Sequence, residues 1–196
     1  MPHRLFELRE YTIRRKVFKL LGAGFSILDR DGRTVGYSEQ KAFRLREDIR
    51  IRAGEGEAGD LIRIHAQQVV DFAAAYDVFD GDTGERVGGA RRHGFRSMVR
   101  DSWELYDDHE RPIAHLQEDS QAMALLRRFV NLIPQTFTLA PLPESGAKAG
   151  DPVQLRQRFN PFVYKLDVSI PDGSGVDPRL VLAVAVLIAA IEGRQD

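Results

Sequence analysis

Residues Leu180–Ile191 read LVLAVAVLIAAI, an unbroken run of twelve apolar residues. Asp177 and Pro178 precede this run and predict the start of a helix, because Asp is a favoured N-cap and Pro is favoured at the first helical position. A helix that is apolar on all sides either lies in a protein core or spans a membrane. A helix of this length extends for about 18 Å, whereas the apolar layer of a bilayer is about 30 Å thick. The run therefore predicts a buried core helix.

Strands and tight turns are predicted upstream of this helix. Three segments share one pattern, in which apolar residues flank a turn that begins with Asp: Ile27–Gly36, Val78–Gly88 and Leu105–Ala114. Gly follows the Asp within the first two turns, and Glu110 stands in its place in the third. Asp side chains cap tight turns, and Gly adopts a positive φ at low cost. Each segment is therefore predicted to form a β-hairpin.

Alternating apolar and polar residues predict further strands between and after these hairpins. The alternation is clearest in Phe43–Arg52 and continues in Leu61–Ala66 after a Gly-rich turn. Such alternation means that one face of a strand lies in the core and the other in water. The pattern recurs around Trp103, Leu105, Ile113 and Leu116, and in Phe137–Leu139, Val153–Arg156 and Val163–Val168. Together with the hairpins this gives about twelve strands, at the short spacing that is typical of an all-β sandwich or barrel.

Three segments interrupt the strand pattern. Gln121–Leu132 is rich in helix formers and Pro134 follows it, which predicts a short helix across one end of a barrel. Pro141–Pro152 is rich in Pro, Gly, Ser and Ala, which predicts an exposed loop. Asn160–Phe162 is predicted to form a turn, with the side chain of Phe162 anchored in the core.

The many strands and the apolar helix account for each other geometrically. Twelve strands about 4.8 Å apart and tilted by about 40° close into a barrel roughly 24 Å across, which inward side chains alone cannot fill. A helix about 10 Å across would occupy the centre. We therefore predict a single mainly β domain over residues 1–196, a closed antiparallel barrel of about twelve strands around the buried apolar C-terminal helix.

The order of these elements resembles the LURP-one-related family, which shares its fold with phospholipid scramblases and the Tubby C-terminal domain. The resemblance rests on the three hairpins, on Gln40 and Lys41 after the first of them, on Arg158–Phe162 and on the final apolar helix. It implies a twelve-stranded barrel around a central C-terminal helix. Because Tubby-type domains bind phosphoinositide head groups, it also implies a lipid-binding role. The chain departs from the scramblases in having no cysteine-rich region, since it contains no cysteine.

Charge and composition limit the possible functions. The formal net charge is −1, so no global field attracts nucleic acid or an anionic membrane, and such binding requires a local patch. The absence of cysteine excludes disulfides, thiolate metal sites and a cysteine nucleophile. The N-terminal residues lack the apolar run of a signal peptide, so we expect a cytoplasmic protein that can also lie at a membrane surface.

Two basic clusters are candidate binding sites for an anion. The first contains Arg91, Arg92, Arg96 and Arg100, and the second contains Arg14 and Arg15. Guanidinium groups bind phosphate through forked hydrogen bonds, so either cluster could hold an anionic head group. Apolar residues next to the second cluster also indicate a membrane-facing edge. An ordinary solvent-exposed face remains the alternative for both clusters.

The sequence does not indicate an enzyme active site. None of the five histidines falls in a metal-spaced pair, no serine lies in a nucleophile elbow, and no glycine-rich phosphate loop precedes a helix. Asp29–Gly32 lacks the ligand spacing of a calcium loop and fits a turn instead. We therefore expect no catalytic residues, no metal site and no cofactor.

These observations predict a non-enzymatic binding domain that recognises anionic phospholipid head groups and has no transmembrane segment. The alternative is an adaptor that binds another protein, through an exposed strand or through Pro141–Pro152. A nucleic-acid-binding regulator is a third interpretation, suggested by the resemblance to Tubby, and the net charge of −1 argues against it.

Overall fold

The computed structural model describes residues 3–16, 23–40, 49–67, 74–93, 102–118, 134–142, 150–160 and 162–192. Within these residues it contains twelve strands, one short 3-10 helix and one α-helix. The strands are β1 Glu10–Arg15, β2 Ala23–Leu28, β3 Thr34–Gln40, β4 Ile49–Arg52, β5 Ile62–Ala66, β6 Ala74–Asp80, β7 Arg86–His93, β8 Ser102–Tyr106, β9 Pro112–Glu118, β10 Thr136–Pro141, β11 Val153–Gln157 and β12 Lys165–Ser169. The helices are η1 Arg4–Glu7 and α2 Pro178–Glu192.

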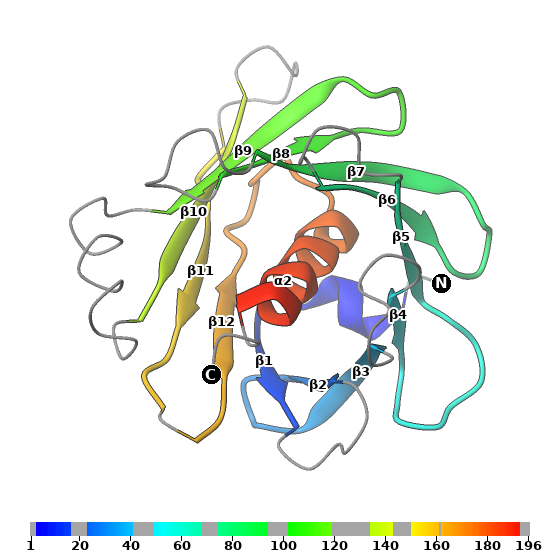
Figure 1. The fold of residues 1–196 in the computed structure, drawn as a ribbon, viewed down its shortest axis with the longest axis vertical. Coiled ribbons are helices and arrows are strands. Elements are labelled where there is room, and N and C mark those ends of the chain that lie inside the picture. The colour runs from blue at the N-terminus through cyan, green and yellow to red at the C-terminus, as the bar shows by residue number, and fades with distance from the viewer. Residues whose placement is uncertain are drawn as a thin grey trace.

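The strands form a closed ring, as Figure 1 shows. Each strand pairs antiparallel with the next one in the sequence, and the ring closes where β1 pairs with β12. In this closing pair Glu10 lies opposite Ser169, and Arg14 lies opposite Lys165. The predicted closed antiparallel barrel is confirmed. The ring also leaves none of the described strands with a free edge, which disfavours the addition of a partner strand to it.

The helix α2 passes through the middle of the ring (Figure 1). Every side chain from Leu180 to Ala190 is at most 2% exposed. Oδ1 of Asp177 accepts a hydrogen bond from the backbone N–H of Arg179 at 2.8 Å, and the carbonyl of Asp177 accepts one from the N–H of Val181 at 3.1 Å. The predicted core helix and its Asp cap are therefore confirmed.

The helix lies very close to the wall at Gly88 on β7. A Cβ atom at this position would lie 2.3 Å from the carbonyl oxygen of Tyr106 and 3.0 Å from a methyl carbon of Leu180. The 2.3 Å contact with the backbone of β8 is not tolerated, so only glycine allows β7 and β8 to approach in this way, and Leu180 of α2 packs at the same position. The first turn of α2 is thus seated directly against the strand.

The three predicted hairpins are present as β2–β3, β6–β7 and β8–β9. In the first turn, Oδ1 of Asp29 accepts hydrogen bonds from the backbone N–H groups of Asp31 at 3.0 Å and Arg33 at 2.9 Å. Asp80 and Asp107 accept two backbone N–H groups each in the other two turns. The aspartates therefore cap the turns as the sequence predicts.

A residue with positive φ follows the aspartate in each of these turns. Gly32 has φ 78° and Gly84 has φ 74°. Glu110, which replaces glycine in the third turn, has φ 61° and is the non-glycine residue of the described chain that adopts this conformation. The third turn therefore keeps the backbone geometry of the other two, although glutamate stands where they have glycine, the residue that favours a positive φ.

Several predicted segments fall wholly or partly outside the described residues. The strand predicted over Phe43–Arg52 is described from Ile49 onward, as β4. The short helix predicted over Gln121–Leu132 lies outside the described residues, and so does most of the loop predicted over Pro141–Pro152. In the part of the chain that is described, no helix has both the length and the apolar character needed to cross a membrane.

The prediction for Phe162 is wrong in one respect. The turn itself forms, since Oδ1 of Asn160 accepts hydrogen bonds from the backbone N–H groups of Phe162 at 2.9 Å and Val163 at 3.0 Å. The Phe162 side chain, however, is 84% exposed and is not anchored in the core. It lies in the turn that connects β11 and β12, where the chain reverses beyond the barrel wall and no inward face exists.

Candidate functional site

The two rims of the barrel differ in what they carry. In this ring all odd-numbered strands run in one direction, so β1 and β7 end at the same rim, where β12 begins. The helix starts at the opposite rim, because Arg179 hydrogen bonds with Asp80 at the end of β6. The helix therefore runs toward the rim that carries Arg15, Arg92 and Lys165, which we call the distal rim. The described members of both predicted basic clusters lie near it.

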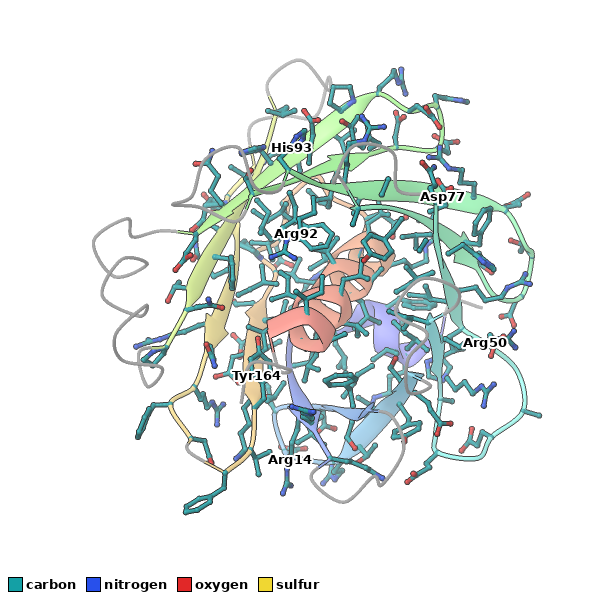
Figure 2. All side chains as sticks on the ribbon, in the orientation of Figure 1. Arg14, Arg50, Asp77, Arg92, His93 and Tyr164 are labelled. Carbon is teal, nitrogen blue, oxygen red and sulfur yellow. The ribbon has the colours of Figure 1, made fainter. Side chains whose placement is uncertain are left out.

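The adjacent residues Arg91 and Arg92 lie on opposite faces of the wall. Successive side chains in a strand alternate between the two faces of a sheet. Ala90 is buried in the core at 2% exposure, so Arg91 faces outward and Arg92 faces the lumen. Figure 2 shows Arg92 inside the ring and the next residue, His93, at its outer side. These two arginines therefore do not form one cluster.

The same alternation separates Arg14 from Arg15 on β1. Ile13 is fully buried, so Arg15 lies on the lumen side and Arg14 lies on the outer face. Strands β2 to β6 separate β1 from β7 on one side of the ring, and β8 to β12 separate them on the other. The two predicted clusters thus lie on opposite walls. Arg96 and Arg100 lie outside the described residues.

On the outer wall, the charge of Arg91 is compensated by its neighbours. Its Nη1 donates a hydrogen bond to the hydroxyl of Tyr106 at 3.3 Å, and its guanidinium lies 5.0 Å from the centre of the Tyr106 ring. Tyr106 donates in turn to Glu104, which also lies 3.3 Å from Nε2 of His93. The hydrogen bond from Tyr106 lowers the pKa of Glu104 below its usual range. Burial, followed by the hydrogen bond to Glu104, raises the pKa of Tyr106 to about 12. Arg91 is therefore part of a paired network.

On the lumen side, Arg92 packs on aromatic rings. Its guanidinium carbon lies 6.0 Å from the centre of the Trp103 ring, and the Trp103 ring lies 5.9 Å from that of Tyr76. Figure 2 shows Arg92 and Tyr164 both inside the ring of strands. A half-buried arginine over an aromatic face stabilises the packing at a barrel end. Because the Arg92 guanidinium is half-buried over Trp103, less of it is accessible to an incoming anion than in an exposed arginine.

Arg14 and Lys165 form a contrasting pair on the opposite wall. They are direct partners in the register of β1 and β12, so two positive side chains lie side by side on the outer face. Like charges in direct opposition destabilise a sheet. Within the described residues neither cation has an ion-pair partner. Such an arrangement leaves positive charge available to a ligand.

An open groove of about 430 Å³ crosses the outer faces of β11, β12 and β1; its lining begins two residues from this pair, at Thr12 and Asp167, and reaches Asp29 and Arg30 after β2 at the opposite rim. Asp167 lies within it, accepting a hydrogen bond from the hydroxyl of Thr12 at 2.7 Å and another from Arg158. That hydrogen bond raises the pKa of Arg158 above its usual value. Arg156 also lines the groove and is exposed; it lies opposite Asp167 in the register of β11 and β12 but forms no ion pair with a described residue. We call Arg14, Lys165, Arg156 and Arg158 the basic face.

Two exposed aromatic side chains lie beside the basic face. Phe159 is 59% exposed and Phe162 is 84% exposed, and they are the large apolar side chains that stand out from the surface of the described chain. Both belong to the connection between β11 and β12, which begins at Arg158 and ends just before Lys165. We call Phe159 and Phe162 the hairpin tip. The distal rim therefore combines free cations with exposed apolar surface at one place.

Sequence reasoning missed most of the basic face. Arg156, Arg158 and Lys165 are interspersed with apolar, aromatic and uncharged polar residues, so they form no dense basic run in the sequence. Arg14 was singled out, but its partner Lys165 is brought to it by the pairing of the first and last strands. The available signal was the alternation of side chains along a strand, which places Arg156 and Arg158, two positions apart, on the same face.

The fold is a closed twelve-stranded barrel around a helix. The basic face lies on the outer wall of this barrel. The chain is similar to the X-ray structure of a protein from Arabidopsis thaliana, with a TM-score of 0.53 and 13% sequence identity, covering 97% of this chain and 98% of that chain. At this identity the likeness shows the fold alone. No protein-family model matches the chain, and no curated protein matches it.

Proposed function

We propose that the protein is a non-enzymatic domain that binds anionic phospholipid surfaces through the basic face. The observation that carries this proposal is the direct opposition of Arg14 and Lys165 without a counter-ion among the described residues. A negative surface would relieve the repulsion between these two cations. Each basic side chain near an anionic membrane contributes about 1 kcal/mol of binding free energy.

The groove supports recognition of a head group next to this surface. Arg156 presents an exposed guanidinium there, and Gln154 and Ser169 line the same groove with polar groups, beside the carboxylates of Glu10, Asp29 and Asp167. A phosphate could be held by forked hydrogen bonds from arginine and by hydroxyl or amide donors. The resemblance of the sequence to LURP-one-related and Tubby-type domains supports the same class of ligand.

Vesicle co-sedimentation tests the proposal. We expect the protein to bind phosphatidylserine-containing vesicles more tightly than phosphatidylcholine vesicles, with binding that weakens as salt is raised. The double variant Arg14→Gln/Lys165→Gln should bind anionic vesicles about thirty-fold more weakly, which corresponds to about 2 kcal/mol. Equal binding to neutral and anionic vesicles at low salt would contradict the proposal.

A matched control comes from the opposite rim. Arg4 and Arg33 are 67% and 69% exposed and pair with Asp29 and Asp31 of the β2–β3 turn. The double variant Arg4→Gln/Arg33→Gln removes the same number of positive charges from the chain but leaves the basic face intact. It should bind anionic vesicles as the wild type does. A loss as large as that of the Arg14/Lys165 variant would show that total charge, and not this face, determines binding.

The second proposal is an adaptor that binds another protein, and the closed ring disfavours one of the two binding modes expected for it. Because the ring closes, addition of a partner strand to the described wall is disfavoured. A protein partner would have to bind a loop or an exposed face instead. A saturable complex with one protein that is insensitive to lipid would favour this second proposal.

A further inference from the structure

The hairpin tip exposes aromatic surface that the fold itself does not use. Phe162 and Phe159 are 84% and 59% exposed, whereas the aromatic residues Phe25 and Phe137 in the wall are each 1% exposed. Full burial of a phenylalanine side chain away from water is worth more than a tenfold change in an equilibrium constant. Exposed apolar side chains beside a charged face are typical of an interaction site.

Hydrogen bonds order the backbone around Asn160 and Phe162. Oδ1 of Asn160 accepts hydrogen bonds from the backbone N–H groups of Phe162 and Val163. The hairpin is closed below it by a hydrogen bond of 2.9 Å from the N–H of Arg158 to the carbonyl of Lys165. Figure 1 shows this turn projecting away from the ring beyond β11 and β12. These hydrogen bonds reduce the backbone entropy that the described part of the turn would lose on binding.

The cations of the basic face lie at a distance from the hairpin tip that would suit contact with lipid phosphates. Lys165 follows Phe162 by three residues, so the two backbones are separated by at most about 10 Å. Apolar groups of interfacial proteins lie about 5–10 Å deep at the boundary between head groups and acyl chains. With the phenylalanines at that depth, Lys165, Arg14 and Arg158 would lie level with the phosphates. Asp167, the acidic residue beside them, is already paired with Arg158 and Thr12.

We infer that Phe159 and Phe162 insert into the interfacial layer of an anionic membrane and thereby hold the barrel with its distal rim toward the lipid. This inference rests on the proposed function and adds to it an anchor and an orientation. The occupant is assigned from charge complementarity, because the apolar tip is flanked by cations and an anionic lipid surface matches both features. The anchor supplies binding free energy that salt does not screen.

Site-specific labelling tests the insertion directly. The chain contains no cysteine, so Phe162→Cys gives a single site for an environment-sensitive fluorophore. Asp82→Cys, in the β6–β7 turn at the opposite rim, is the matched control. With phosphatidylserine vesicles that contain brominated acyl chains, we expect quenching of the label at position 162 and none at position 82.

A second variant measures what the anchor contributes. Phe159→Ser/Phe162→Ser should bind phosphatidylserine vesicles at least about tenfold more weakly and should keep the thermal midpoint of the wild type, because both side chains are exposed. Its residual binding should be abolished by moderate salt.

The outcomes separate the inference from the proposed function. If the serine variant binds anionic vesicles as tightly as the wild type and the label at position 162 stays unquenched, the anchor is disproved while binding through the basic face stands. If the wild type does not bind anionic vesicles at all, both proposals fall. If the label at position 162 responds to protein concentration without vesicles, the tip contacts a second copy of the chain, and the membrane assignment is overturned.

Discussion

Nη1 of Arg179 donates a hydrogen bond of 2.9 Å to Oδ2 of Asp80, although the two residues are 99 positions apart in the sequence. The same guanidinium binds the carboxylate of Asp177, with Nη2 at 2.7 Å from Oδ2. Arg179 thus joins the first turn of the core helix to its own N-cap and to the β6–β7 turn of the wall. The contact fixes where the helix enters the barrel.

Removing this contact should destabilise the fold. The side chains of Arg179 and Asp80 are 33% and 17% exposed, so solvent screens the pair only in part. We expect Arg179→Ala to lower the free energy of unfolding by about 1–2 kcal/mol, measured by urea denaturation. Arg33→Ala, which breaks an exposed pair with Asp31, should cost less than about 0.5 kcal/mol. Equal losses in the two variants would mean that the Arg179 contact is no stronger than a surface pair.

The same contact gives the stability a defined pH dependence. The backbone N–H of Thr83 is the main cause that lowers the pKa of Asp80 below its usual value of 3.8, and Arg179 adds to it. The folded chain therefore favours the ionised carboxylate, and this stabilisation is complete above the unfolded-state pKa and is lost as the pH falls through the lower folded-state pKa.

We expect Asp80→Asn to be less stable than the wild type at neutral pH, because the neutral side chain cannot replace the charged acceptor. The difference should narrow progressively as the pH falls below about 4, because the wild-type carboxyl then becomes protonated. Urea unfolding at a series of pH values measures this. A difference that stays constant or grows on acidification would contradict the assignment.

The three aspartate turns allow a test of backbone strain. Glu110→Gly should stabilise the protein by about 0.5–1 kcal/mol, because a non-glycine residue at φ 61° is strained. Gly32→Ala should destabilise it by about 1 kcal/mol through φ alone, since a Cβ atom there would have no atom within 4 Å. Thermal unfolding of the two variants checks both predictions. If Glu110→Gly is destabilising, the contact of Glu110 with Arg86 at 3.4 Å outweighs the strain.

Helix α2 should be indispensable to the wall around it. A chain that ends at Val176 should aggregate or lose cooperative unfolding, because the inward side chains of the strands would line an empty lumen. The milder change Leu187→Ala removes a side chain that is 1% exposed and should cost about 2–5 kcal/mol. Size-exclusion chromatography and calorimetry measure the two effects. A truncated chain that remains monomeric and folds cooperatively would show that the helix is not the core.

Local chemistry and periodicity made the fold predictable. The Asp turns depend on a few neighbouring residues, and the cap at Asp177 depends on the next two, so both can be read from the sequence. The apolar run Leu180–Ile191 has no polar face and is too short to span a membrane, so burial in the core is the environment that suits it. The closed ring followed from having enough strands to surround that helix.

The candidate site was less predictable, for physical reasons that differ between residues. Arg91 and Arg92 look like a cluster in the sequence, yet neighbours in a strand point to opposite faces. Arg14 and Lys165 become neighbours through the register of the closing strands, which no local pattern specifies. Phe162 was expected in the core because it is apolar, but the tip of a turn has no inward face.

The pairing of β1 with β12 also has a consequence for biosynthesis. Strand β1 must wait for β12 to be translated before it gains its second neighbour, and α2 is translated after both. Until then the nascent chain holds an open sheet with an apolar inner surface. The native state is therefore completed only after α2 has been made, and the interval before it is when the open sheet is most prone to aggregation.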